Sequence, residues 1–107
     1  GLIDAYFRNR EELTGLVVVM DIRHPLKEFD RLMLDYGSAR GLSCHCLLTK
    51  ADKLPRGQQS KTLLEVQRAL GAFATAQLFS AESKQGVEQA RSLLTQWLEL
   101  PLPAAAT

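Results

Sequence analysis

The chain has 107 residues, enough for one domain of ordinary size, and its 46% hydrophobic and 23% charged residues are typical of a folded globular protein. Its 13 basic and 12 acidic residues leave a net charge of +1, so the composition indicates neither a nucleic-acid-binding nor a membrane-surface protein. No apolar stretch approaches the roughly 20 residues of a membrane span, and the first residues lack the pattern of a secretory signal.

The first part of the chain predicts a helix and a strand. Residues 2–13 carry apolar side chains among charges, which is typical of a surface helix. The run Leu16–Met20 is continuously apolar and ends at Asp21. A run without polar alternation indicates a strand that is buried on both faces of a parallel sheet.

A second helix is predicted after this strand. Pro25 suits the first turn of a helix, because the first turn does not use the N–H that proline lacks. Gly37 and Gly41 are typical stop signals. Spacings of three and four residues predict one apolar face, formed by Leu26, Phe29, Met33 and Tyr36.

The next strand is predicted at about residues 43–49. Because side chains alternate along a strand, Cys44 and Cys46 point to one face and His45 to the other. This arrangement suits neither a disulfide nor a metal site, so we expect two reduced, buried thiols. Reduced thiols in turn predict a cytoplasmic protein.

The rest of the chain continues the alternation of strands and helices. A polar loop at 53–57 leads into a predicted helix, and a third strand is predicted at 77–81. The last helix is predicted from about residue 87. The apolar faces of these two helices are Leu63, Val66, Leu70 and Phe73 for the first, and Val87, Ala90, Leu94 and Trp97 for the second.

This order of elements predicts an α/β fold. Strands separated by helices indicate right-handed crossovers, and therefore three parallel strands with flanking helices in a three-layer αβα arrangement. Residues 1–100 are predicted to form the domain. Residues 101–107 contain two prolines and small side chains, and they predict a disordered tail.

The motif with the clearest chemistry is Thr49-Lys50-Ala51-Asp52, directly after the second predicted strand. A carboxylate at Asp52 can accept hydrogen bonds from the ring N–H and the exocyclic amine of guanine, a pair of donors that adenine lacks. Each such bond contributes roughly 1.5–3 kcal/mol. The stem of Lys50 can lie across the base while its ammonium stays in water. Open parallel sheets bind ligands at this edge, so the position favours a guanine site.

A second candidate follows the third predicted strand. Ser80-Ala81 is a turn of small residues, which lets a backbone N–H approach the O6 atom of guanine. The competing interpretation is that Asp52 caps a turn and that Ser80 satisfies local backbone donors. Asp21 and Arg23 end the first strand, and for them we predict mutual pairing or helix capping rather than a ligand role.

Together these features resemble the C-terminal half of the EngB (YihA/YsxC) family of bacterial GTP-binding proteins. The resemblance extends to about Trp97, and threonine at the first position of the guanine motif is usual in that family. The residues that carry it are Gly15–Lys27 with Asp30, Leu48–Leu54, and Gln77–Ala81 with Lys84, Gln85, Gly86 and Val87; Tyr6, Arg10 and Leu13 also fit.

The resemblance implies half of a P-loop GTPase domain. Members of the family are cytoplasmic, bind GTP or GDP with Mg²⁺, and act in assembly of the large ribosomal subunit and in normal cell division and septation. By position, the resemblance assigns the guanine contacts to Thr49, Lys50, Asp52, Ser80 and Ala81. It implies the large ribosomal subunit as a partner and no membrane contact.

The 107 residues contain neither a Gly-rich loop ending in Gly-Lys-Ser/Thr nor an Asp-x-x-Gly element. Residues 57–62 lack a glycine directly before Lys61 and open a helix, so they do not form a phosphate loop. In the family these elements, with the Mg²⁺ ligands, lie N-terminal to the stretch that this chain resembles. We therefore predict no hydrolysis and at most weak base binding by these residues alone.

The strand at 16–20 pairs with the phosphate-loop strand in the family's sheet. Without that partner its apolar edge is a template for association. We expect a homodimer or strand swap through this edge, aggregation, or pairing with a further segment.

Two other functions remain open from the sequence. One is a non-enzymatic α/β module that binds protein or RNA, with an accidental Thr-Lys-Ala-Asp match. The other is a flavodoxin-like domain with an acidic site at Asp21 and Asp52, which would bind magnesium or flavin without guanine.

Overall fold

The computed structural model describes residues 15–99, and these form a parallel sheet of three strands. The strands are β1 (Gly15–Asp21), β2 (Ser43–Thr49) and β3 (Ala74–Leu78), in the order β1-β2-β3. β1 and β2 are in register from Gly15 opposite Ser43 to Asp21 opposite Thr49. The helix predicted at 2–13 and the tail predicted at 101–107 lie outside the described residues.

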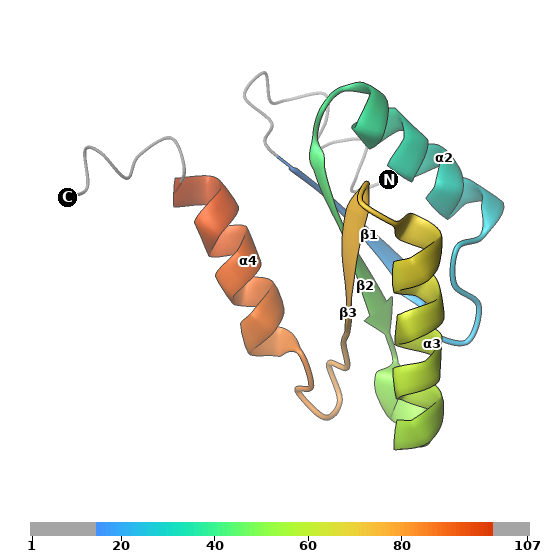
Figure 1. Ribbon diagram of the computed structural model, residues 1–107. Coiled ribbons are helices and arrows are strands. Elements are labelled where there is room, and N and C mark those ends of the chain that lie inside the picture. Colours follow the sequence, from blue (N-terminus) through green and yellow to red (C-terminus); the bar gives the residue numbers. More distant parts are fainter. Residues whose placement is uncertain (1–14, 100–107) are drawn as a thin grey trace.

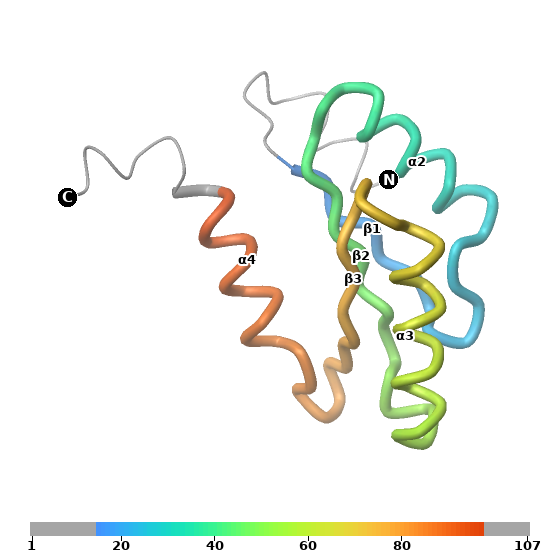
Figure 2. Tube along the Cα trace, in the orientation of Figure 1, coloured from blue at the N-terminus to red at the C-terminus, as the bar shows by residue number. Residues whose placement is uncertain are grey.

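Helices cover both faces of this sheet. α2 (Glu28–Ala39) and α3 (Arg56–Leu70) lie on one face, and α4 (Val87–Glu99) lies on the other (Figure 1, Figure 2). A short 3₁₀ helix, η1 (Ala51–Lys53), follows β2. This arrangement confirms the predicted αβα fold with parallel strands. Within residues 15–99, no helix has the length and apolar character needed to cross a membrane.

The hydrophobic core lies between the sheet and the helices α2 and α3. Alternate residues of the strands point into it, together with Met33 of α2 and Val66 of α3. Gly37 lies inside α2 rather than at its end. A Cβ atom there would overlap Cys44 Sγ and Leu16 Cδ2, so glycine lets the helix pack closely on the sheet. The strand residues of this core are Leu16, Val18, Met20, Cys44, Cys46, Leu48 and Ala76.

The predicted apolar face of α2 is wrong at two positions. Phe29 is 61% exposed and Tyr36 is 40% exposed, whereas Met33 is buried. The helix begins three residues after Pro25, where the Lys27 N–H donates to the Asp30 carboxylate at 3.0 Å. The buried side of α2 carries Asp30, Met33 and Gly37, so the spacing of apolar residues alone placed the face incorrectly.

The predicted bounds of α3 and β3 also need correction. α3 ends at Leu70, so Phe73 lies beyond the helix and is 75% exposed. β3 runs over residues 74–78 instead of 77–81. Its last paired residue is Leu78, opposite Leu48. The Phe79 N–H still donates to Leu48 O, but Lys50 then turns the chain away from β3 with a left-handed backbone, and Phe79 O accepts from the Ala51 N–H instead.

The other face of the sheet is more polar. His45 of β2 and Thr75 and Gln77 of β3 point to the side of α4. Trp97 of α4 packs against Gly15 so closely that a Cβ atom at Gly15 would overlap its ring. This contact links the end of α4 to the start of β1.

Candidate functional site

The loops that follow the three strands lie together at one end of the sheet, the lower end in Figure 1. Backbone hydrogen bonds hold them there. The Ile22 N–H donates to Thr49 O at 3.0 Å, and the Phe79 N–H donates to Leu48 O at 2.9 Å. The Ala51 N–H donates to Phe79 O at 3.0 Å, so the loop after β2 is anchored to the end of β3.

The structure brings Asp52 and Ser80 into contact across 28 residues of sequence. The Ser80 hydroxyl donates to Asp52 Oδ1 at 2.7 Å and accepts the Ser83 N–H at 3.1 Å. Ser80 is fully buried, whereas Asp52 is exposed. Within residues 15–99, Oδ2 of Asp52 has no hydrogen-bond partner, and Oδ1 keeps a second lone pair. Ser80 therefore has the expected local role and also orients a carboxylate that still faces solvent.

Lys50 and Thr49 connect the same loop to β1. Lys50 has a left-handed backbone (φ +59°), which turns the chain sharply, and its exposed ammonium lies 3.9 Å from Asp21 Oδ2. The Thr49 hydroxyl donates to Met20 O at 3.1 Å. Thr49 thus joins two strand ends, and the Lys50 side chain remains exposed to solvent.

The turn after β3 leaves a backbone donor open. Ala81 is exposed, and its N–H has no partner among the described residues. The turn closes through Ser80 and Gln85, and it ends at Gly86, whose φ is +78°. A Cβ atom at Gly86 would overlap Leu78 O and Gln77 Nε2, so this position requires glycine.

A buried polar network, which the sequence did not reveal, fixes the far end of this turn. The Gln77 amide donates to Gly86 O at 2.8 Å and to Leu78 O at 3.0 Å. With both donors used, its oxygen accepts from His45 Nε2–H at 2.8 Å, and Nδ1 of His45 lies 2.6 Å from the Thr75 hydroxyl. Burial lowers the pKa of His45, so the ring is neutral at neutral pH. The one signal in the sequence for this network was that His45 and Gln77 are polar residues within predicted strands.

Asp21 and Arg23 form an ion pair beside the site. Arg23 Nε and Nη2 donate to the two Asp21 oxygens at 3.0 and 2.8 Å, and the Arg23 N–H adds a third bond at 2.8 Å. The hydrogen bonds and charge of Arg23 hold the pKa of the Asp21 carboxyl well below its usual range. This geometry confirms the predicted mutual pairing.

The two thiols are buried in the core as expected. Cys44 and Cys46 are free, and burial raises the pKa of the Cys46 thiol to about 12. Within residues 15–99, no group of three His, Cys, Asp or Glu side chains is arranged to hold a metal ion. The described residues therefore do not by themselves fit a Mg²⁺ site.

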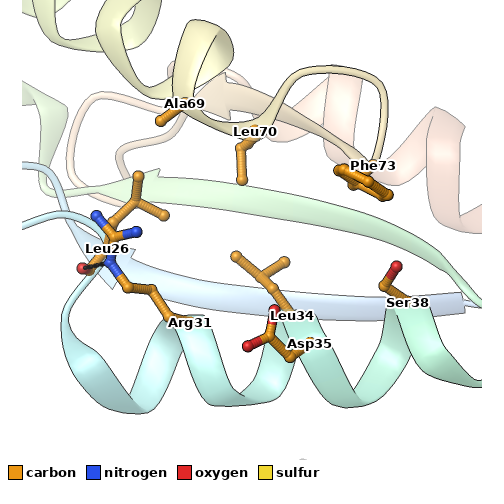
Figure 3. A pocket seen from close by; sticks show the side chains of 8 residues that line it. All are labelled: Leu26, Arg31, Leu34, Asp35, Ser38, Ala69, Leu70 and Phe73. Atoms are coloured by element: carbon orange, nitrogen blue, oxygen red, sulfur yellow. Dashed lines mark hydrogen bonds between the residues drawn. The ribbon is translucent and has the colours of Figure 1, made fainter.

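Two hollows lie away from the strand-end loops. A groove of about 280 Å³ runs between α2 and α3, with Leu34, Leu70 and Phe73 on its apolar floor and Arg31 and Asp35 at its rim (Figure 3). A second hollow of about 600 Å³ lies between β3, α3 and α4. None of the five candidate residues lines either one.

Comparison of the sequence with known proteins identifies relatives of this chain. No protein-family model matches the chain. A protein of Xanthomonas euvesicatoria pv. vesicatoria, named "Probable GTP-binding protein EngB", is 54% identical over 108 residues, which cover 97% of this chain and 52% of that protein. A protein of the same name from Stenotrophomonas maltophilia is 56% identical over 102 residues, covering 92% of this chain and 51% of that protein. The chain belongs to the EngB family.

The chain spans about half the length of the EngB relatives that it matches. Because the match to the first EngB protein covers 97% of the chain, it includes both the loop at Asp52 and the loop at Ser80. The similarity to EngB proteins therefore covers the segments from which the guanine contacts were assigned.

Proposed function

We propose that the chain binds the guanine base of GTP or GDP at the loops that follow β2 and β3. The observation that carries this proposal is the hydrogen bond from Ser80 to Asp52, which joins the two loops and leaves the other carboxylate oxygen without a partner among residues 15–99. The names of the EngB relatives, which refer to GTP binding, support the same function over an accidental match.

Each candidate residue has a separate role in this proposal. Asp52 accepts the ring N–H and the exocyclic amine of guanine, and the open Ala81 N–H donates to O6. The Lys50 stem lies across the base. Thr49 and Ser80 hold the two loops through Met20 O and Asp52. A base that offers donors in another pattern leaves the Asp52 carboxylate unpaired, which is the physical basis of selectivity.

We further propose that the intact protein is a cytoplasmic P-loop GTPase that acts in assembly of the large ribosomal subunit and in cell division and septation. This part of the proposal is supported by the family resemblance. The phosphate loop and the Mg²⁺ ligands are assigned to none of the 107 residues, because the motifs that supply them do not occur here. The role of these residues is to recognise the base.

The free edge of β1 supports a proposal about partners. Among the described strands, β1 pairs only with β2, and its Val19 side chain is 56% exposed. We propose that this edge pairs with a further strand, in a homodimer of the 107-residue chain or in the intact protein. Sedimentation velocity on the 107-residue chain tests the homodimer, and a monodisperse monomer would contradict it.

The test of base recognition is a titration of fluorescent GDP with the natural protein that contains these residues, competed by GDP and by ADP. We expect GDP to displace the probe and ADP to compete at least about a hundredfold more weakly, because ADP lacks both donors for Asp52. Equal competition by the two nucleotides, or no binding, would refute guanine recognition.

A further inference from the structure

Gln59, in the first turns of α3, is buried beside the loop that contains Asp52. Its amide nitrogen donates two hydrogen bonds to that loop, to Ala51 O at 2.6 Å and to Leu54 O at 2.8 Å. These two carbonyls flank Asp52 and its neighbour Lys53. The glutamine therefore holds both ends of the short segment that carries the carboxylate.

The oxygen of the same side chain connects to the second loop. Gln59 Oε1 accepts from Gln85 Nε2 at 3.1 Å. The backbone oxygen of Gln85 in turn accepts the Ser80 N–H at 2.9 Å. Ser80 closes the circuit through its 2.7 Å hydrogen bond to Asp52. Two side-chain hydrogen bonds thus cross between the loops, one from Ser80 to Asp52 and one from Gln85 to Gln59.

We propose that Gln59 is a positioning residue for the guanine site, and that it sets the placement of Asp52 relative to the Ala81 N–H. This inference rests on the proposed base recognition. Three of the four hydrogen-bonding groups of the side chain are used, all on the two loops. Gln59 acts through Asp52 and Gln85, and it is buried at 7% exposure, so it does not contact the base itself.

The physical consequence is preorganisation. A carboxylate discriminates between bases only if its two oxygens are held where the two donors arrive. Without Gln59, the carbonyls of Ala51 and Leu54 each lose a buried donor, and the loop can relax toward water. Removing Gln59 is therefore expected to reduce selectivity for the exocyclic amine of guanine more than it reduces binding of the phosphates.

The test compares Gln59→Met with Gln58→Met in the natural protein that contains these residues. Methionine keeps the length of the side chain but cannot donate to two carbonyls. Gln58 is the adjacent, exposed glutamine of the same helix, so it is a matched control. The affinities of GDP and IDP are measured for each variant, because inosine lacks the exocyclic amine that Asp52 accepts.

We expect Gln59→Met to weaken GDP binding about tenfold and IDP binding only about twofold, so that the GDP/IDP ratio falls about fivefold. Gln58→Met leaves both affinities and their ratio unchanged. A variant that merely destabilises the fold lowers both affinities together and keeps the ratio. A second variant, Gln85→Met, is expected to lower the ratio less, with an effect that is not additive with that of Gln59→Met.

Hydrogen exchange on the nucleotide-free proteins separates this inference from the proposed function. We expect faster exchange in Gln59→Met at the Leu54 N–H and the Ser80 N–H, one in each loop, and no change in Gln58→Met. If the unsubstituted protein does not bind GDP, the proposed function fails whatever the exchange shows. If it binds GDP and Gln59→Met retains both the GDP/IDP ratio and the exchange rates, the role of Gln59 is refuted.

Discussion

The two faces of the sheet are built from the same three strands, but they bury different chemistry. The face under α2 and α3 is apolar, with Val18, Cys46 and Leu48 at or below 1% exposure. The face toward α4 carries His45, which hydrogen-bonds to Gln77, and Gln77 in turn donates to Gly86 O in the loop after β3. The first face has the packing that stabilises a fold, and the second connects the fold to the candidate site.

The comparison teaches that burial serves two purposes in this small domain. Apolar burial on the α2 and α3 face stabilises the sheet, and it also holds the bases of two loops through Ile22 and Ala51. The polar side chains Gln59 and Gln77 are buried at a cost in desolvation, which their hydrogen bonds to loop carbonyls offset. These hydrogen bonds hold the loop that contains Asp52 and the loop that contains Ser80.

The largest expected difference between the faces is in stability. Leu48 is fully buried in the core, whereas its neighbour Leu47 is half-buried on the opposite face. We expect Leu48→Ala to lower the free energy of unfolding by about 2–5 kcal/mol, through lost transfer energy and a cavity. Leu47→Ala is expected to cost less than about half as much. Urea unfolding followed by circular dichroism measures both, and equal losses would break the comparison.

A smaller effect is expected where the polar face meets the loop. Gly86 has a φ of +78° and no room for a Cβ atom next to Leu78 O. We expect Gly86→Ala to destabilise the protein by about 1–3 kcal/mol. The control is Gly57→Ala in the first turn of α3, where a Cβ meets no atom within 4 Å and alanine is the better helix former. Thermal unfolding should show a lower midpoint for the first variant and an unchanged or higher midpoint for the second.

The smallest effect is the pH dependence that His45 gives to the polar face. Burial lowers the pKa of His45 in the folded state below its ordinary value of 6.5. Between these two pKa values the unfolded chain binds a proton that the folded chain does not. The contribution of His45 to stability is therefore complete above about pH 6.5 and is lost as the pH falls toward the folded-state pKa.

This dependence is measured as the urea midpoint between pH 7.5 and pH 5, with His45→Asn as the comparison. We expect the unsubstituted protein to lose stability more steeply than the variant as the pH falls below 6.5. Parallel profiles for the two proteins would show that His45 does not titrate in this network.

The sequence predicted the fold well because its signals were local and repeated. The continuous run in β1 and the turn residue Gly41 each indicated the correct element, and the alternation of strands and helices indicated the parallel sheet. Spacing did not predict which side of α2 is buried, because two of its three buried residues, Asp30 and Gly37, are not apolar side chains. The bounds of β3 were wrong because the pairing ends at Leu48 and Leu78, where Lys50 turns the chain after β2 with a left-handed backbone that the residue pattern did not indicate.

The sequence predicted only those candidate-site residues that belong to a recognisable motif and would contact the base directly or through its partner. Asp52 and Ser80 stood out because each follows a strand, and the structure brings them to 2.7 Å. Gln59 carried no signal, since a glutamine in a helix is most often exposed, and Gln77 offered only its position in a predicted strand. Their roles follow from which backbone carbonyls lie within reach, and these are set by tertiary structure.

The most direct test of the central claim, that Asp52 reads guanine, is a change of base preference in Asp52→Asn. An asparagine amide can accept the ring N–H and donate to the carbonyl that xanthine has in place of the guanine amine. We predict that Asp52→Asn weakens GDP binding at least about tenfold and makes XDP the preferred diphosphate. Undiminished GDP binding by the variant, with no gain for XDP, would contradict the account.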